Sequence, residues 1–386
     1  MVDLLTGFPF RSAEFVEKAS SSLRLLRGDN IGHGTLRWDG ARYWPEDKTF
    51  DLKRYSLVSG DVTIAMDRPW ISSGLKWAEA RTSDLPCLLV QRVARLRAKG
   101  PLEQSFLPYL ISSKQFTDYV QGVQTGTAVP HISSKQIEDF RFHCPSRSEQ
   151  WAMAAVLRAL DEKISVNERI TTTADQLSTS LFRQAFIENP LEFVEQALSN
   201  TSEFINGKAF TKGASGTGRM VVRIAEINSG PGGSTVYNDI DVPEKHLARP
   251  GDVLFAWSGS LTVARWFRPE SIINQHIFKC VPKNGYPYWL VSQLLNRKIH
   301  EFRTIAAAKA TTMGHIQRKH LDEPVSVPEP AMLHSLNGKI GPLWDRALLA
   351  EQESLTLAAL RDTLLPQLMS GRLRVRDAEK IVEDYV

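Results

Sequence analysis

Two polar segments carry the residue types best suited to binding an anionic polymer. They are TGTAVPHISSKQ, residues 125–136, and AKATTMGHIQRK, residues 308–319. Lys and Arg side chains neutralise phosphates, while Gln, Asn, Ser and Thr side chains form hydrogen bonds with phosphates and with base edges in the major groove. The residue types therefore indicate a nucleic-acid interface.

Candidate contacts come from these segments and from arginines near the ends of predicted strands. Loop residues that differ between the two segments are the better candidates for reading different sequences, because a shared residue is better explained by a shared structural role. The DNA-binding candidates are Arg27, Arg68, Gln124, Thr125, Thr127, Lys135, Arg223, Arg265, Lys309, Thr311, Thr312 and Arg318.

Local structure offers an alternative role for some of these polar residues. Ser133 and Gln136 have the spacing of a capping box, so Ser133 is as well suited to cap a helix as to contact DNA. His131 and His315 each precede an Ile at equivalent positions, which favours a structural role for both.

Motifs for catalysis or metal binding do not occur in the sequence. It has no GxxxxGK[ST], HExxH or GxSxG pattern. The pair Asn189-Pro190 follows a predicted helix and is interpreted as a helix stop, not as part of a methyltransferase motif. Cys87, Cys144 and Cys280 lie far apart and lack zinc-binding spacing. We therefore expect no catalytic residue, no metal site and no cofactor in this chain.

Bulk composition is that of a folded protein with more than one domain. The 386 residues are 42% hydrophobic and 23% charged, and the formal net charge is +4. This mild positive charge permits an anionic partner without requiring one. The first residues lack a secretory pattern, and no apolar run approaches the length of a membrane span. The expected location is the cytoplasm, with no membrane association.

The chain contains an internal repeat. GFPF from Gly7 recurs as GKAF from Gly207, an offset of 200, and GDVTIAM from Gly60 recurs as GDVLFAW from Gly251, an offset of 191. VQRV and NQHI, like HIS and HIQ, match at an offset of 184, and LSTSLFRQ and LRDTLLPQ match at 183. Chance recurrence of common strand and turn patterns would scatter these offsets, whereas two copies that differ by loop insertions and deletions keep them ordered.

Each copy is predicted to be a mixed α/β (α+β) region followed by a long helix. Short apolar runs separated by Gly, Pro, Asp and Asn indicate strands and turns. Apolar residues then recur at helical spacing from residue 149 to 186 and again from about 336 to 369, with Ser370-Gly371 as the second helix stop. The sequence predicts two similar mixed domains joined and separated by two long antiparallel helices, an internal repeat with pseudo-two-fold symmetry.

A rigid spacer between two similar domains suits a double-stranded DNA partner. About 35 helical residues extend roughly 50 Å at about 1.5 Å per residue. Half-sites one turn of DNA apart are separated by about 34–36 Å, so two domains held apart can read both.

The doubled plan, the GFPF opening, the GDV strand, NQHIFKCVP and the closing helix LLPQLMSGRLRV together resemble the DNA-specificity subunits of type I restriction-modification systems. The resemblance covers nearly the whole chain. It implies a non-catalytic subunit with target recognition domains at 1–146 and 191–330, helical spacer regions at 147–190 and 331–375, and a charged tail at 376–386.

The resemblance also implies partners. Methyltransferase subunits, expected to number two, would bring S-adenosylmethionine, and a restriction and translocase subunit would bring ATP and Mg²⁺. The long helices would bind the methyltransferase through apolar and aromatic residues, although the same residues could pack within their own domains. The candidates are Trp151, Leu160, Ile164, Leu177, Leu181, Trp344, Leu360 and Leu364.

At its start the sequence departs from the family pattern. Family members carry a further stretch before the GFPF equivalent, and the second copy keeps its counterpart at residues 191–210. We expect either a late annotated start or a first domain that lacks an element supplied by a partner. Three other functions remain possible, namely a stand-alone DNA-binding regulator, a protein-binding scaffold, and a fragment of a fused nuclease-methyltransferase, whose catalytic motifs this chain lacks.

Overall fold

A computed structural model describes residues 1–386 except 72, 127–129, 309–313 and 386. Its contacts divide the chain into two compact units. Unit 1 is Met1–Asp161 with Ala359–Val386, and unit 2 is Glu162–Ala358. This division cuts each long helix into two parts, whereas the sequence treats the helices as separate regions, so the predicted domain boundaries stay a prediction.

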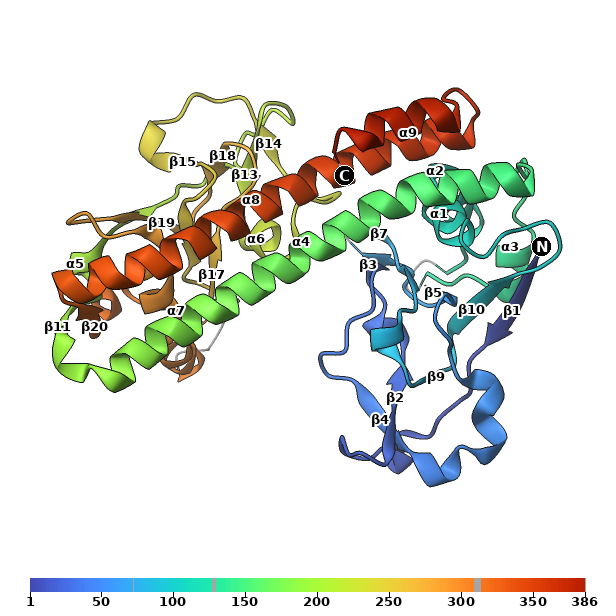
Figure 1. Ribbon diagram of the computed structural model, residues 1–386, viewed down its shortest axis with the longest axis horizontal. Helices are drawn as coiled ribbons and strands as arrows, with labels where there is room; N and C mark the ends of the chain where they lie inside the picture. Colours follow the sequence, from blue (N-terminus) through green and yellow to red (C-terminus); the bar gives the residue numbers. More distant parts are fainter. Residues whose placement is uncertain (72, 127–129, 309–313, 386) are drawn as a thin grey trace. The chain divides into compact units, whose positions relative to one another are not determined.

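Unit 1 contains two main sheets (Figure 1). Its strands are β1 (Val2–Thr6), β2 (Ser22–Leu26), β3 (His33–Gly34), β4 (Arg42–Pro45), β5 (Val62–Ala65), β6 (Trp70–Ile71), β7 (Gly74–Leu75), β8 (Trp77–Glu79), β9 (Cys87–Leu89) and β10 (Val93–Ala98). One sheet has the order β1-β10-β5-β8-β3 and the other β4-β2-β9, in which β2 and β9 run parallel. The helices are α1 (Leu107–Ser112), α2 (Lys114–Val123) and α3 (Ser134–Glu138).

Unit 2 repeats this plan. Its strands are β11 (Phe193–Ala197), β12 (Ser202–Asn206), β13 (Arg219–Val222), β14 (Tyr237–Asn238), β15 (Leu247–Ala248), β16 (Val253–Ala256), β17 (Thr262–Arg265), β18 (Ser271–Ile273), β19 (Ile277–Pro282) and β20 (Pro324–Pro328). The helices are α5 (Leu198–Thr201), α6 (Ile224–Ser229) and α7 (Tyr288–Ala308). The sheets have the orders β12-β19-β16-β17 and β14-β13-β18-β15, and β11 pairs with β20.

The repeat predicted from the sequence is confirmed in the strand topology. The antiparallel order β1-β10-β5-β8 of unit 1 matches β12-β19-β16-β17 of unit 2. The parallel pair β2 and β9 matches the parallel pair β13 and β18. Two mixed copies of one fold are therefore present.

The repeated glycines of the GFPF and GKAF motifs have the same steric cause. A Cβ atom at Gly7 would lie 2.2 Å from the Val90 carbonyl oxygen, and one at Gly207 would lie 2.1 Å from that of Asn274. Both glycines sit where two backbones pass closely, next to the parallel bridges Phe8 to Val90 and Lys208 to Asn274. A side chain at either position would force these backbones apart.

The repeated GDV motif forms the same turn in both copies. Gly60 has a φ of +89° and Gly251 a φ of +95°, values that favour glycine. The following carboxylates close the turn, because Asp61 accepts a 2.8 Å hydrogen bond from the Val58 amide and Asp252 a 2.7 Å bond from the Arg249 amide. Each turn leads into a fully buried central strand, β5 or β16.

The long helices are α4 (Arg147–Glu188) and α8 (Pro330–Met369). Helix α8 begins about six residues before the predicted start and continues through Gly338, Gly341 and Pro342. Pro330 is compatible with the first helical turn. Tertiary packing explains the continuation, because Leu336 and Ile340 are buried in the core of unit 2 on either side of Gly338.

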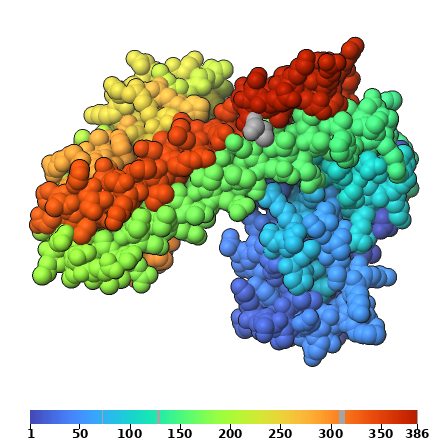
Figure 2. Space-filling view, viewed as in Figure 1, coloured from blue at the N-terminus to red at the C-terminus, as the bar shows by residue number. Residues whose placement is uncertain are grey.

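The two helices run antiparallel. Within unit 2, Asn167 donates a 2.8 Å hydrogen bond to Glu353, and Thr171 contacts the carbonyl oxygen of Ala347. Residue numbers therefore rise along α4 as they fall along α8. Figure 2 shows the unit 2 parts of these helices side by side on the surface.

The end of α8 agrees with the predicted stop, but the last residues are not merely a charged tail. Gly371 has a φ of +69°, and the Arg372 amide donates to the Gln367 carbonyl oxygen at 3.0 Å, which ends the helix. Helix α9 (Val375–Glu383) follows, with Ala378 and Val382 buried. Because this segment is rich in charged residues, its short apolar stripe was not recognised in the sequence.

No helix in the described part of the chain is long and apolar enough to cross a membrane.

Candidate nucleic-acid interface

The first polar segment is fixed at the end of β5. Thr125 and His131 exchange backbone hydrogen bonds of 3.0 and 2.8 Å, which closes a loop between them. The next residue, Ile132, is fully buried, and its amide donates to the Met66 carbonyl oxygen at 2.8 Å. A buried apolar residue thus holds a polar loop at one end of the central sheet.

The second polar segment is fixed in the same way at the end of β16. His315 forms a backbone bridge with Ser258, as His131 does with Asp67. Ile316 is 3% exposed, and its amide donates to the Trp257 carbonyl oxygen at 3.2 Å. In both copies the residues at the described end of the polar segment are therefore anchored at an equivalent place.

The base of the first loop is built from charged groups. The Asp67 carboxylate lies 2.6 Å from His131 Nδ1 and forms an ion pair with Arg92. Burial opposes ionisation of Asp67, but hydrogen bonds from Arg92 and His131 outweigh it and lower the pKa of this carboxyl group. Arg92 is held at a φ of +65°, next to strand β10.

The base of the second loop is aromatic instead. The Trp257 ring lies 5.1 Å from the His276 ring and 6.3 Å from the His315 ring, measured between centroids. Its indole nitrogen donates to Asn206 at 2.9 Å. His276 has a φ of +72° and is the counterpart of Arg92, so one backbone position carries different chemistry in the two copies.

Sequence reasoning missed Asp67, Arg92, Trp257 and His276. A signal for two of them was present, because Arg92 and His276 occupy the same place in the matched pair VQRV and NQHI. Asp67 and Trp257 lie at or just beyond the ends of GDVTIAM and GDVLFAW, so the match gave little reason to single them out.

Some of the side chains predicted to contact DNA from the first loop are exposed, and others form hydrogen bonds within unit 1. Lys135 is exposed and lies 3.6 Å from Asp139, and Thr125 is exposed. Gln124 is partly buried and accepts a 2.7 Å hydrogen bond from the Trp70 indole. Ser133 accepts a hydrogen bond from the Gln136 amide at 3.2 Å, so the capping alternative is confirmed.

Thr127, Lys309, Thr311 and Thr312 lie outside the described residues.

Three predicted arginines remain at the surface of their units. Arg68 is exposed, and its amide donates to the Pro130 carbonyl oxygen at 2.8 Å, beside the first loop. Arg27 is partly exposed and pairs with Asp29 at 3.3 Å. Arg318 is exposed at the start of the turn that follows the second loop. These arginines stay candidates for phosphate contact.

Arg223 is held by an internal ion pair. Its side chain donates to Glu226 at 3.0 and 2.6 Å and to the Ser234 carbonyl oxygen at 2.7 Å. The hydrogen bonds and charge of Glu226 raise the pKa of Arg223 above its usual value, against the effect of burial. This guanidinium is largely occupied within the unit.

Arg265 has a different role from the one predicted. Its side chain is 4% exposed and lies 2.8 Å from Glu351 on α8 and 3.2 Å from Asp175 on α4. Its guanidinium carbon lies 4.5 Å from the centre of the Trp344 ring. Arg265 joins β17 to both long helices inside unit 2, so it is unavailable to a phosphate in this structure.

Several of the predicted partner-binding residues are used for internal packing. Leu160 and Leu364 are buried within unit 1, and Leu181 and Trp344 pack against the core of unit 2. Ile164 and Leu360 are partly buried. Trp151 and Leu177 are exposed, at 67% and 46%, and stay candidates for partner binding. Several of these apolar side chains therefore pack within their own units, which is the alternative that the sequence left open.

The described residues contain no group of three or more His, Cys, Asp or Glu side chains placed to hold a metal ion. The three cysteines are free thiols, and burial raises the pKa of Cys87 to about 12 and also raises that of Cys280. Such thiols stay protonated and behave as small apolar groups.

No protein-family model matches the chain. The chain is 36% identical over 180 residues to the EcoAI specificity subunit of a type I restriction enzyme from Escherichia coli, a match that covers 46% of this chain and 30% of that one. It is 31% identical over 170 residues to the MjaVIII specificity subunit from Methanocaldococcus jannaschii, covering 44% of this chain and 39% of that one. The matches thus span less than two fifths of these relatives' length.

A solved structure shows the same fold over almost the whole chain. It is the type I restriction-modification S subunit from M. genitalium, with a TM-score of 0.54 and 17% identity, covering 95% of this chain and 93% of that one. In sequence and in fold, the chain is thus related to the specificity subunits of type I restriction-modification systems.

Proposed function

We propose that this chain selects a bipartite sequence in double-stranded DNA, with one copy of the repeat reading each half. The observation that carries the proposal is the pair of polar loops fixed at equivalent ends of β5 and β16 but built on different bases. A shared backbone with divergent side chains is what two readers of different half-sites require. The relationship to specificity subunits supports the same reading.

Binding would combine phosphate contacts with contacts to base edges. Arg27, Arg68, Lys135 and Arg318 supply the positive charge, and affinity falls as salt rises because each neutralised phosphate releases condensed counterions. The loop residues between Gln124 and His131, and their counterparts before His315, supply base discrimination.

The chain would act as a non-catalytic subunit. Two methyltransferase subunits would supply S-adenosylmethionine and the methylation of adenine, and a restriction and translocase subunit would supply ATP-dependent cleavage with Mg²⁺. Trp151 and Leu177 give α4 exposed apolar side chains for docking a subunit. The assembly would work in the cytoplasm.

Methylated adenines in host DNA, mapped with and without the gene, test this function. The expected result is one bipartite motif whose methylation disappears with the gene, and co-purification of this chain with a methyltransferase. Unchanged methylation, with sequence-selective DNA binding by the chain alone, would instead indicate a stand-alone regulator. A chain without selective DNA binding, even with its partners, would be a protein-binding scaffold.

A further inference from the structure

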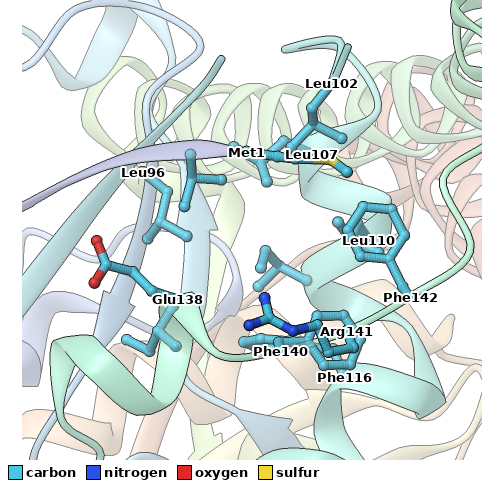
Figure 3. Close-up of a pocket in the computed structure, with 13 residues that line it drawn as sticks. Met1, Leu96, Leu102, Leu107, Leu110, Phe116, Glu138, Phe140, Arg141 and Phe142 are labelled. Atoms are coloured by element: carbon cyan, nitrogen blue, oxygen red, sulfur yellow. The ribbon is translucent and has the colours of Figure 1, made fainter. Parts of the chain in front are cut away.

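Two surfaces of different chemistry lie along strand β10 of unit 1. Leu96, within the strand, lines an apolar groove together with Phe116 and Phe142 (Figure 3). Arg92 lies just before the strand and forms an ion pair with Asp67. Hydrogen bonds to a base edge require donors and acceptors, which aliphatic side chains and phenylalanine lack. The surface at the start of β10 is therefore better suited to DNA than the groove.

Arg92 lies beside the first polar loop, although the two are distant in sequence. The Met66 amide donates to the Arg92 carbonyl oxygen at 2.9 Å, and the Met66 carbonyl oxygen accepts from the Ile132 amide at 2.8 Å. One residue just after β5 therefore joins Arg92 to the end of the loop. In unit 2 the Trp257 amide donates to the His276 carbonyl oxygen at 3.1 Å in the same way. His276 thus occupies the position of Arg92 in the second copy.

The backbone at this position is strained in both copies. The φ angles of +65° at Arg92 and +72° at His276 lie in the left-handed region, which non-glycine residues seldom adopt. Such a conformation costs free energy and persists only where the surrounding structure fixes it. Among the described residues, four non-glycine residues have a positive φ, and three of them, Arg68, Arg92 and His276, adjoin the loop bases. The strain is thus concentrated beside the loops, where it fixes the direction in which each side chain leaves the backbone.

The Arg92 side chain is exposed and yet held in place. It is 68% exposed, and its Nη1 atom pairs with one oxygen of the Asp67 carboxylate. The other oxygen of Asp67 lies 2.6 Å from His131 Nδ1. Within the described part of the chain, Nη1 is the only side-chain nitrogen of Arg92 with a hydrogen-bond partner. The edge formed by Nε and Nη2 is therefore available to a ligand with two neighbouring acceptors.

This arrangement suits a guanine base better than a phosphate. The Asp67 carboxylate offsets the positive charge of Arg92, and it would repel a phosphate that approached the pair. The major-groove edge of guanine has two neighbouring acceptors, N7 and O6, and carries no formal charge. A bidentate contact from arginine to these two atoms is the commonest specific contact to a base. A guanidinium that is already oriented by a carboxylate loses less conformational freedom when it binds.

From these contacts we infer that Arg92 reads a guanine in the half-site recognised by unit 1, and that Asp67 positions its guanidinium. In unit 2 the His276 ring lies 5.1 Å from the Trp257 ring, between centroids, and has no planar fork of donors. The two copies therefore read different bases from one backbone position. This inference rests on the proposed function and extends base reading to a residue outside the polar loops.

Modified DNA tests the inference on the complex assembled with methyltransferase subunits. The probe is a duplex that carries the methylated motif, and the half read by unit 1 is the half retained when residues 191–330 are exchanged. Each guanine of that half, on either strand, is replaced in turn by 7-deazaguanine, which pairs with cytosine but lacks the N7 acceptor. At one guanine the replacement should weaken binding of the wild-type complex by at least about fivefold.

Matched variants assign this effect to Arg92. Arg92→Ala should bind the modified and unmodified duplexes equally and should accept other base pairs at that position, with selectivity retained elsewhere. Asp67→Asn should relax selectivity at the same base pair, whereas a purely structural role would not confine the effect to one position. Arg147→Ala is the control and should keep full selectivity, because Arg147 in unit 1 is 66% exposed and pairs with Glu103 at 3.3 Å. Thermal unfolding verifies that the variants fold.

The possible results separate this inference from the proposed function. A retained half without guanine, or one in which no 7-deazaguanine weakens binding of the wild-type complex, would overturn the inference and leave the proposed function intact. The same holds if Arg92→Ala binds all sequences more weakly by one factor, because that result is expected of a phosphate contact. The absence of any bipartite methylated motif would contradict the proposed function and this inference together.

Discussion

The bases of the two polar loops share a backbone and differ in chemistry. In unit 1 a carboxylate, Asp67, holds Arg92 and His131, and in unit 2 an aromatic ring, Trp257, lies against His276 and His315. The bridge from Asp67 to His131 is equivalent to the bridge from Ser258 to His315, and Arg92 and His276 have similar positive φ values of +65° and +72°. The repeat thus preserves the backbone positions at the base of each loop, whereas the chemistry of the side chains there differs.

A second contrast concerns how each sheet is joined to the long helices. In unit 1, Glu79 on β8 pairs with Arg158 on α4 at 3.1 Å, and both side chains are partly exposed. In unit 2, Arg265 at the corresponding place on β17 is buried between Asp175 and Glu351. The sign of the charge on the sheet is reversed, and we expect the loss of one partner to cost more stability at the buried site of unit 2.

The largest loss of stability is expected from substituting Gly7 and Gly207. These substitutions test whether both copies have the same close approach of two backbones. Gly7→Ala and Gly207→Ala each place a Cβ about 2 Å from a carbonyl oxygen, so each should destabilise its own unit by more than about 4 kcal/mol. Denaturant unfolding, monitored by hydrogen exchange in each unit, measures the loss of stability.

Gly122→Ala and Gly233→Ala are the controls, because nothing lies within 4 Å of a Cβ at either position. If Gly7→Ala proved harmless while Gly207→Ala did not, the two approaches would not be equivalent.

The next effect concerns the buried arginine. Arg265→Met leaves Glu351 buried without its partner and should destabilise unit 2 by about 3 kcal/mol. Arg265→Met combined with Glu351→Leu should recover most of the loss. Arg158→Met, which breaks the more exposed pair of unit 1, should cost no more than about 1 kcal/mol. Equal costs at the two arginines, measured by denaturant unfolding, would remove the contrast between the units.

A smaller effect depends on pH. The pKa of Asp67 is lowered below its usual 3.8. Its stabilisation is therefore complete above that value and is lost as the pH falls through the lower folded-state pKa. Asp67→Asn should remove about 1 kcal/mol near pH 7 and flatten the pH dependence of unfolding below about pH 4.

Ser258→Ala, at the equivalent place in unit 2, should leave that pH dependence unchanged. Parallel curves for wild type and Asp67→Asn would show that the carboxylate does not stabilise the first loop.

The smallest effect concerns phosphate contacts. Lys135→Ala should weaken DNA binding a few-fold across all sequences and lower the salt dependence by about one counterion. Arg265→Lys, at a buried site, should leave the salt dependence unchanged. Titration of the assembled complex at several salt concentrations measures both. A change of sequence preference in Lys135→Ala would assign this lysine to base reading instead.

Much of the fold could be predicted because the repeated motifs are residues that the backbone geometry requires. Gly7 and Gly207 recur because two backbones pass closely at the same place in both copies. The GDV motifs with Asp61 and Asp252 recur because both copies form the same turn. The early start of α8 could not be predicted, because packing of Leu336 and Ile340 overrides the local effect of Gly338 and Pro342.

Side-chain roles were harder to predict than backbone positions. Arg265 lies near a strand end and looked available to phosphate, yet its burial depends on α4 and α8, which are distant in sequence. Leu160 and Leu364 follow helical spacing equally well for a partner and for internal packing, and periodicity alone cannot separate the two. The loop bases were missed because they join residues from different segments.

Each copy of the repeat is proposed to read its own half of a bipartite site. Exchange of residues 191–330 for the same region of a relative, followed by mapping of methylated adenines, tests it most directly. One half of the methylated motif should change and the other half should be retained. A motif in which both halves change, or neither does, would contradict it.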